Sequence, residues 1–143
     1  MRHRRTTAAV ASLAVIGAVA ILTGCAQGAG LITQTSESGH VLLAQERAVG
    51  AYPDAGVEGT FVLVGDTCFG LTREGATFTT VFPPGTSIVE GTEQISIPGW
   101  GTLSLGDEFT GGGVYYTQDS ASYSNQVPAE CRTDELVAVN PFR

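Results

Sequence analysis

Lysine is absent from this chain of 143 residues, so all seven of its basic residues are arginines. The absence excludes mechanisms that need a lysine amine, such as Schiff-base formation or hydrolysis by a serine–lysine pair. Histidine is almost as scarce, occurring only at His3 and His40. Once an N-terminal leader is removed, a serine nucleophile would have only His40 as its base, and no G-x-S-x-G motif is present. We interpret His40 as a solvated linker residue.

Motifs for metals and cofactors are missing as well. The sequence has no D-x-D-x-D-G calcium loop, and its glycine triplet at 111–113 lies between apolar residues typical of a strand rather than before a helix. The three cysteines, Cys25, Cys68 and Cys131, lack the neighbouring cysteines or histidines of a metal site. We therefore expect neither a metal ion nor a cofactor.

The N-terminus has the three-part layout of a secretory signal. Arg2, Arg4 and Arg5 precede an almost uninterrupted run of small apolar residues over 8–22, which ends in Leu22-Thr23-Gly24-Cys25. The run is short for a permanent membrane helix and is interrupted by glycine. Leu22-Thr23-Gly24-Cys25 resembles the lipobox of bacterial lipoproteins, with an aliphatic residue, two small residues and a cysteine. The alternatives are a plain signal peptide with an incidental cysteine and, less favoured, a transmembrane anchor.

The lipobox resemblance carries several implications. Residues 1–24 would be a signal peptide, and Cys25 would become the first mature residue because its thiol accepts the lipid. The protein would then be held at the extracytoplasmic face of the cell membrane by acyl chains such as palmitate. The membrane, reached through Cys25, is thus the first partner that we expect.

Removal of residues 1–24 makes the chain strongly acidic. Four arginines remain, against all fourteen acidic residues of the sequence, so the mature part has a formal charge of −10. A domain of this sign is repelled by phosphate backbones and by anionic lipid headgroups. Binding to nucleic acid is therefore disfavoured.

With Cys25 assigned to the lipid, Cys68 and Cys131 are the only other cysteines. Thiols of exported proteins are normally oxidised, so we predict a disulfide between these two, in preference to a metal pair or a reactive thiol. Closing a loop of about 63 residues stabilises a chain by roughly 4 kcal/mol in the chain-entropy model.

The segment that follows Cys25 contains few bulky residues. Residues 26–39 are rich in Gly, Ser, Thr and Gln, which predicts a flexible tether. Residues 40–49 fit either a strand or a short helix, and we expect an extended segment leading into the domain. The predicted organisation is therefore a signal peptide at 1–24, a lipidated cysteine and tether at 25–50, and a β domain at 51–143.

Short segments rich in β-branched and aromatic residues alternate with Gly, Pro and Asp across this domain. Turns are expected at Gly65-Asp66, at Arg73-Glu74-Gly75 and after Pro83-Pro84, and a polar surface loop over 117–126. The alternation also predicts that Ile95, Ile97, Leu103 and Leu105 share one face. We expect strands over 61–64, 67–71, 77–82, 86–89, 94–97, 102–105, 109–116 and 136–139.

This pattern predicts an all-β fold of six to eight short strands, forming either a small antiparallel barrel or a sandwich. Glycines 111–113 indicate a bulge, a sharp corner or a closely approaching backbone within one strand. Because a strongly coiled strand needs such a bend, the barrel is favoured.

Several segments over residues 57–140 resemble small secreted bacterial domains of unassigned function, many of them lipoproteins, with an OB-like barrel. The resemblance is carried by Phe82-Pro83-Pro84-Gly85-Thr86, Leu105-Gly106-Asp107-Glu108-Phe109, the glycine triplet and Pro128-Ala129-Glu130-Cys131. It implies turns and a disulfide, and it names no ligand.

Two groups of residues are candidates for a functional site. Trp100, Tyr115, Tyr116 and Tyr123 could stack on sugar rings or contact a protein partner, or they could instead close the barrel end and pack across strands. The acids Asp66, Asp107 and Glu108 are candidates for a general acid and base. Asp66 and Asp107 each follow a glycine between strands, so we favour a turn role for them.

The sequence therefore predicts no catalytic residues and a non-enzymatic role. We expect a membrane-anchored module that binds or scaffolds another envelope component, either a protein or a polysaccharide. The alternative is a carbohydrate- or peptidoglycan-directed enzyme that uses the turn carboxylates. A subunit of a larger envelope complex is a third possibility.

Overall fold

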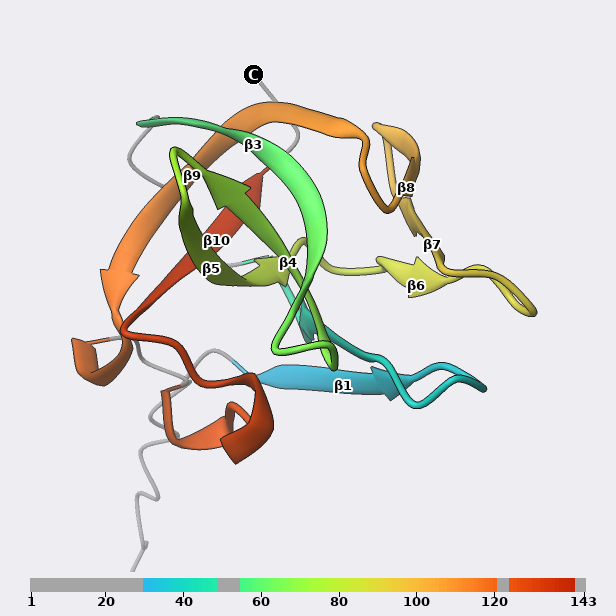
Figure 1. Cartoon of the computed structure of the whole chain (residues 1–143), viewed down its shortest axis with the longest axis horizontal. Coiled ribbons are helices and arrows are strands. Elements are labelled where there is room, and N and C mark those ends of the chain that lie inside the picture. Colours follow the sequence, from blue (N-terminus) through green and yellow to red (C-terminus); the bar gives the residue numbers. More distant parts are fainter. Residues whose placement is uncertain (1–29, 49–54, 121–123, 141–143) are drawn as a thin grey trace, which may run out of the picture.

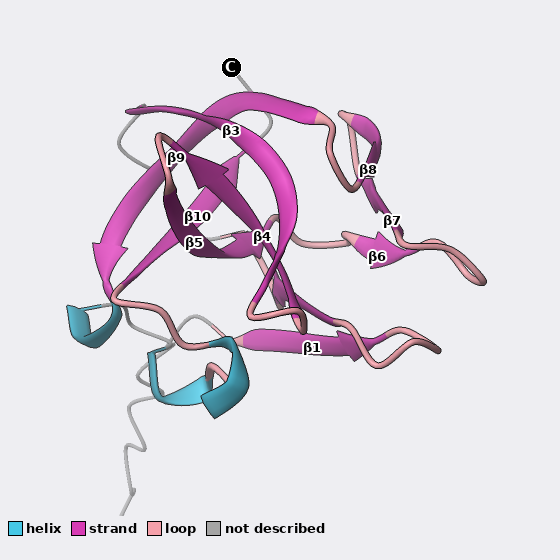
Figure 2. Ribbon diagram, in the orientation of Figure 1, coloured by secondary structure: helices cyan, strands magenta, loops and turns pink. Residues whose placement is uncertain are grey.

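The computed structural model describes residues 30–48, 55–120 and 124–140, which form an all-β domain as predicted (Figures 1 and 2). Cys25 and the predicted signal peptide lie outside these residues. The strands are β1 (Leu31–Thr35), β2 (Val41–Gln45), β3 (Ala55–Val64), β4 (Cys68–Arg73), β5 (Ala76–Phe82), β6 (Ser87–Ile88), β7 (Gln94–Ile97), β8 (Gly101–Ser104), β9 (Glu108–Thr117) and β10 (Glu135–Asn140). Three short 3₁₀ turns are η1 (Gln118–Ser120), η2 (Ser124–Gln126) and η3 (Ala129–Cys131).

Five strands pair in a ring, in the order β3, β4, β5, β10, β9 and back to β3. The pairing of β10 with β5 is parallel, which corrects the expectation of a wholly antiparallel barrel. The pairing of β4 with β5 runs from Arg73 and Ala76 as far as Gly70 and Thr79. Beyond that point β2 pairs in parallel with both strands. The barrel is therefore not closed along its whole length, and β2 completes the sheet where β4 and β5 separate.

The prediction of a flexible tether is wrong for residues 31–35, which form a strand, whereas the extended segment expected over 40–49 does contain one. These two strands are β1 and β2, which pair antiparallel from Leu31 with Gln45 to Thr35 with Val41. Every residue of β2 is buried, whereas β1 lies at the sheet edge and exposes most of its side chains. The polar composition that suggested a tether belongs to an edge strand and its turn. The described domain thus begins before residue 51.

Two tight turns have the conformation that their sequences require. Gly65 and Asp66, between β3 and β4, both have positive φ angles of 58° and 60°. Glu74 and Gly75, between β4 and β5, have φ angles of 51° and 83°. Two consecutive residues with positive φ are typical of the type I′ turn, whose twist matches that of the flanking strands. The predicted turns at both positions are confirmed.

The glycine triplet allows β9 to lie against β10 at close range. A Cβ atom on Gly113 would lie 2.4 Å from the carbonyl oxygen of Ala138 and 2.8 Å from a methyl group of Val57. No side chain fits at such a distance, so glycine is required there. Of the alternatives predicted for the triplet, the structure shows the close backbone approach.

Side chains pack into two clusters on opposite sides of the strands. The larger cluster contains Phe61, whose ring stacks on that of Phe69 at 5.3 Å and meets that of Phe82 edge-on at 6.0 Å. It extends to the second sheet, β6–β7–β8, through Ile95, Ile97 and Leu103. Leu105, which was predicted to share this face, does not join them. It lies after the end of β8 at Ser104 and is 38% exposed.

The smaller cluster surrounds the disulfide between Cys68 and Cys131, which confirms the predicted pairing. Both cysteines are fully buried, and their Cα atoms are 5.5 Å apart. The Thr79 hydroxyl donates a hydrogen bond to the Cys131 carbonyl. The disulfide thereby fixes η3 against the start of β4, just before β10 begins.

Within the described ranges 30–48, 55–120 and 124–140, no helix has the length and apolar character needed to cross a membrane.

Candidate functional site

A polar groove lies between the turn that joins β1 to β2 and the loop that joins β6 to β7. Both segments project on the same side of the molecule (Figure 1). The groove encloses about 390 Å³. All but two of its lining residues carry a polar side chain: Gln34, Thr35, Ser36, Glu37, Ser38, Ile88, Glu90, Gly91, Thr92 and Glu93.

The first wall of the groove is shaped by local hydrogen bonds around Ser36. The Ser36 hydroxyl accepts from the His40 backbone N–H at 2.9 Å, and the Ser36 backbone N–H donates to the His40 carbonyl at 2.8 Å. The Gly39 N–H donates to the Ser36 carbonyl, and the positive φ of 89° at Gly39 closes the turn. The turn holds Ser38 and His40 toward the opposite loop.

Glu93 connects the two walls. Its carboxylate accepts a hydrogen bond from the Ser38 hydroxyl through Oε1, and its Oε2 contacts Nδ1 of His40. The Ser38 hydrogen bond, followed by the His40 hydrogen bond, lowers the pKa of Glu93 below its ordinary value. Hydrogen bonds to a carboxylate favour its charged form, so this contact is held most strongly by the ionised glutamate.

His40 is not the solvated linker residue that the sequence suggested. Its side chain is 20% exposed, and its ring meets the edge of Phe69 at 6.0 Å. The prediction was wrong because the contact with Glu93 joins positions 53 residues apart. No local pattern in the sequence indicates that pairing.

The Ser38, Glu93 and His40 contacts differ from those of a hydrolytic triad. In a triad the histidine lies between the acid and the serine, so that it can take the proton of the hydroxyl. Here Glu93 lies between Ser38 and His40, and both bond to it. The arrangement therefore joins the two groove walls and does not place the His40 imidazole beside the Ser38 hydroxyl.

The floor of the groove is set by Gln34, whose side-chain amide joins the two sheets. Its Nε2 donates to the Thr86 carbonyl at 2.8 Å, and its Oε1 accepts from the Ile88 N–H at 3.3 Å. These are the backbone groups that a neighbouring strand would use at the free edge of β6. The amide of Gln34 thus replaces a strand partner and keeps β1 beside β6.

The carboxylates considered for catalysis serve other contacts. Asp66 lies in the β3–β4 turn, at the positive φ described above. Asp107 accepts a hydrogen bond from the Ser104 N–H at 2.8 Å in the turn before β9. Glu108 accepts from the Thr60 hydroxyl at 2.9 Å. All three side chains are exposed, and none of them lines the groove.

The described aromatic candidates do not gather in one patch. Trp100 follows β7 and packs on Phe109 at 5.4 Å. Tyr115 meets Phe78 at 5.3 Å on one side of β9, whereas Tyr116 packs against the disulfide cluster on the other. All three are partly buried, and Tyr123 lies outside the described residues.

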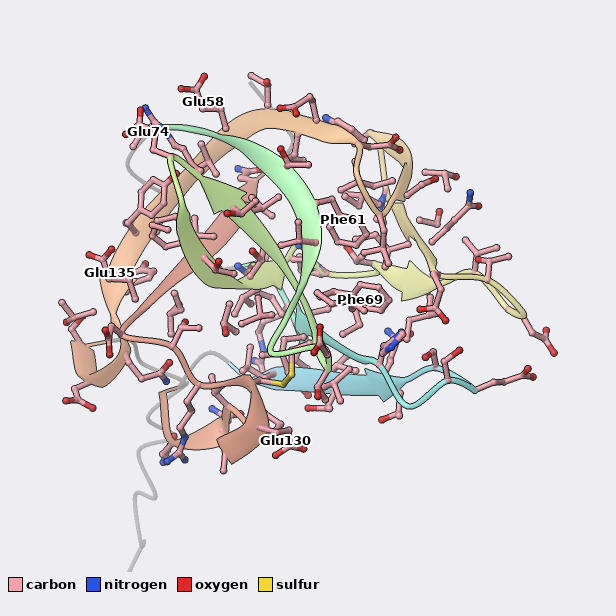
Figure 3. All side chains as sticks on the ribbon, viewed as in Figure 1. Glu58, Phe61, Phe69, Glu74, Glu130 and Glu135 are labelled. Carbon is pink, nitrogen blue, oxygen red and sulfur yellow. A yellow bond between two sulfur atoms is a disulfide. The ribbon has the colours of Figure 1, made fainter. Side chains whose placement is uncertain are left out.

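A second polar hollow, of about 370 Å³, lies at the far ends of β3 and β4. Arg73 lines it and approaches Glu58 at 3.1 Å and Glu74 at 3.7 Å, and Figure 3 shows both glutamates at the same corner. The hydrogen bond to Tyr115, followed by the charge of Glu58, raises the pKa of Arg73. Arg73 thus offsets part of the charge of the three carboxylates that line this hollow, Glu58, Glu74 and Glu108, whereas the groove lining has three carboxylates and no arginine.

Three or more His, Cys, Asp or Glu side chains do not come together in a metal-binding arrangement within the part of the chain that the structure describes. Comparisons with family models, with curated proteins and with solved structures found no match.

Proposed function

We propose that the chain is an exported lipoprotein, acylated at Cys25, whose β domain is a non-enzymatic binding module of the cell envelope. The groove between the β1–β2 turn and the β6–β7 loop is the observation that carries the binding role. It brings hydroxyl, amide and carboxylate groups from two sheets to one concave surface. Small-molecule and glycan sites are typically concave surfaces with a few converging polar groups.

The ligand class follows from the groove lining. Hydroxyls of Thr35, Ser36 and Thr92 stand near the carboxylates of Glu37 and Glu90. Carboxylates accept hydrogen bonds from the hydroxyls and amines of a ligand, and hydroxyls can both donate and accept them. An envelope polysaccharide with free amines, or an envelope protein that presents basic side chains, fits this surface.

We further propose that the ring of five strands is an OB-like barrel. The support is the number of ring strands and the opening between β4 and β5 that β2 fills. OB domains are partly open five-stranded barrels, and several bind oligosaccharides.

A binding role is preferred to a catalytic one for two reasons. Asp107 and Glu108 are occupied by turn and strand contacts, and the imidazole of His40 contacts the Glu93 carboxylate rather than a serine hydroxyl. General acid and base catalysis needs a proton donor or acceptor within reach of a reacting group. The turn acids lie outside the groove between the β1–β2 turn and the β6–β7 loop.

Two measurements test the proposal. Mass spectrometry of membrane-extracted protein should show a mature N-terminus at Cys25 with attached acyl chains, and Cys25→Ser should release the protein from the membrane fraction. The acylated protein should sediment together with purified cell-wall polysaccharide, which shows binding. The double variant Glu90→Gln with Glu37→Gln should bind more weakly. The matched variant Glu74→Gln, in the second hollow, should bind as the wild type does. Release of new reducing ends, lost in Asp107→Asn, would instead favour the enzyme.

A further inference from the structure

The distance between the acylation site and the folded domain is short. Gly30, the first described residue, lies five positions after Cys25. Five residues span at most about 18 Å when fully extended. An anchor at Cys25 therefore keeps Gly30 within that distance of the membrane surface, whatever path the chain takes.

The start of β1 is held on two sides. The Gly30 carbonyl accepts from the Glu46 N–H at 2.8 Å, just after β2. The Leu31 N–H donates to Oε1 of Gln126, at the end of η2, at 3.0 Å. The chain is thus fixed where it enters the domain, so the anchor restrains this end of the molecule and not another.

The groove lies at the other end of β1. A strand rises about 3.3 Å per residue, so the six residues from Gly30 to Ser36 place the groove wall roughly 20 Å from the anchor end. Figure 1 shows the start of β1 at one end of the strand, beside 3₁₀ turns, and the β6–β7 loop beyond its other end.

The anchor end also carries the surface that best suits a bilayer. Ile32, on β1, is one of two exposed large hydrophobic side chains in the described ranges and is 42% exposed. Two of the three described arginines are close by. Arg47 follows Glu46, and Arg132 donates to the carbonyl of Val127, the residue after Gln126. The nearby acids are Glu46, which pairs with Arg47 at 3.6 Å, Glu130, Asp134 and Asp119, which lines a shallow hollow together with Arg132.

We infer that the membrane contacts the domain at this anchor end, through Ile32, Arg47 and Arg132, and that the groove faces away from the bilayer. The inference rests on the proposed acylation of Cys25. An exposed isoleucine and arginines are favourable at a lipid interface, whereas the acidic groove is repelled by anionic headgroups. The groove therefore receives its ligand from the envelope space and not from the membrane.

The test uses the full acylated protein in phosphatidylcholine vesicles that contain some lipid with a nitroxide headgroup. A fluorophore is attached through a noncanonical amino acid at Ala48, near the anchor end, or at Glu90, at the groove. Both positions are exposed, and neither uses a cysteine. The nitroxide should quench the label at Ala48 severalfold more than the label at Glu90.

Two variants sharpen the result. A long Gly-Ser insertion before Gly30 should narrow the difference in quenching between the two labels, because it relaxes the length restraint and leaves only the surface contact to orient the domain. Ile32→Ser should reduce quenching at Ala48, whereas Leu105→Ser, at the other exposed hydrophobic residue, should not. Equal quenching at the two labels in protein shown by mass spectrometry to be acylated overturns the orientation alone. Protein without acyl chains overturns both the orientation and the proposed anchoring.

Discussion

Loss of the disulfide should destabilise the domain more than any conservative surface change. Cys68 and Cys131 are separated by 63 residues, and both are fully buried. For a loop of this length, the chain-entropy model predicts a loss of about 4 kcal/mol from the free energy of unfolding. In a domain of roughly 110 residues, this corresponds to a fall of about 15–20 °C in the melting temperature.

The double variant Cys68→Ala with Cys131→Ala is the appropriate perturbation. Alanine leaves no buried hydroxyl without a partner, whereas serine would add that cost. The melting temperature is measured by circular dichroism on the soluble domain. Wild-type protein with reductant serves as a second route to the same state, because it breaks the bond and keeps both sulfurs in the cluster.

Comparing the two states distinguishes the effect of losing the covalent bond from the effect of losing the packed sulfur atoms. The melting temperature of reduced wild type should fall by most of the 15–20 °C that the entropy model predicts. The double variant should melt a few degrees lower still, because its alanines leave small cavities. Equal melting of wild type with and without reductant would refute the reasoning. It would mean that the bond is absent in solution or that the unfolded chain is already compact.

Three further predictions concern single residues. Gly113→Ala should lower the free energy of unfolding by about 2–3 kcal/mol in urea titrations, since the added methyl overlaps the Ala138 carbonyl. The control Thr117→Ala, on the same strand, should change it by less than about 0.5 kcal/mol. Phe61→Ala, in the centre of the larger cluster, should cost about 4 kcal/mol in the same titration, and a loss below 1 kcal/mol would contradict the packing described. Because the pKa of Glu93 is lowered, its contribution to stability is present above its ordinary pKa and is lost as the pH falls below about 4. The difference in melting temperature between wild type and Glu93→Gln should therefore disappear in acid, and a difference independent of pH would contradict the contact.

Local features of the sequence predicted the parts of the fold that local chemistry determines. Two-residue turns at Gly65-Asp66 and Glu74-Gly75 are set by residues that tolerate positive φ. Pro83 and Pro84 lack backbone donors, so β5 ends at Phe82. The disulfide followed from counting cysteines.

Features that depend on distant partners were not predictable in the same way. The sequence of Val41–Gln45 fits either a strand or a short helix. It is a fully buried strand because β4 and β5 separate and β2 pairs with both of them. The Glu93 contacts that define the groove connect residues 53 and 55 positions apart. The parallel pairing of β10 with β5 likewise has no local signature. The absence of α-helix from the described residues and the position of most strands were foreseeable, but the groove was not.

Insertion of β2 between β4 and β5 has a consequence for how the chain reaches its native state. A polypeptide is synthesised from its N-terminus, so β2 is made before either strand that will flank it. Its five residues bury completely only after Phe82 is available. The N-terminal hairpin therefore cannot be fully buried before β4 and β5 have formed.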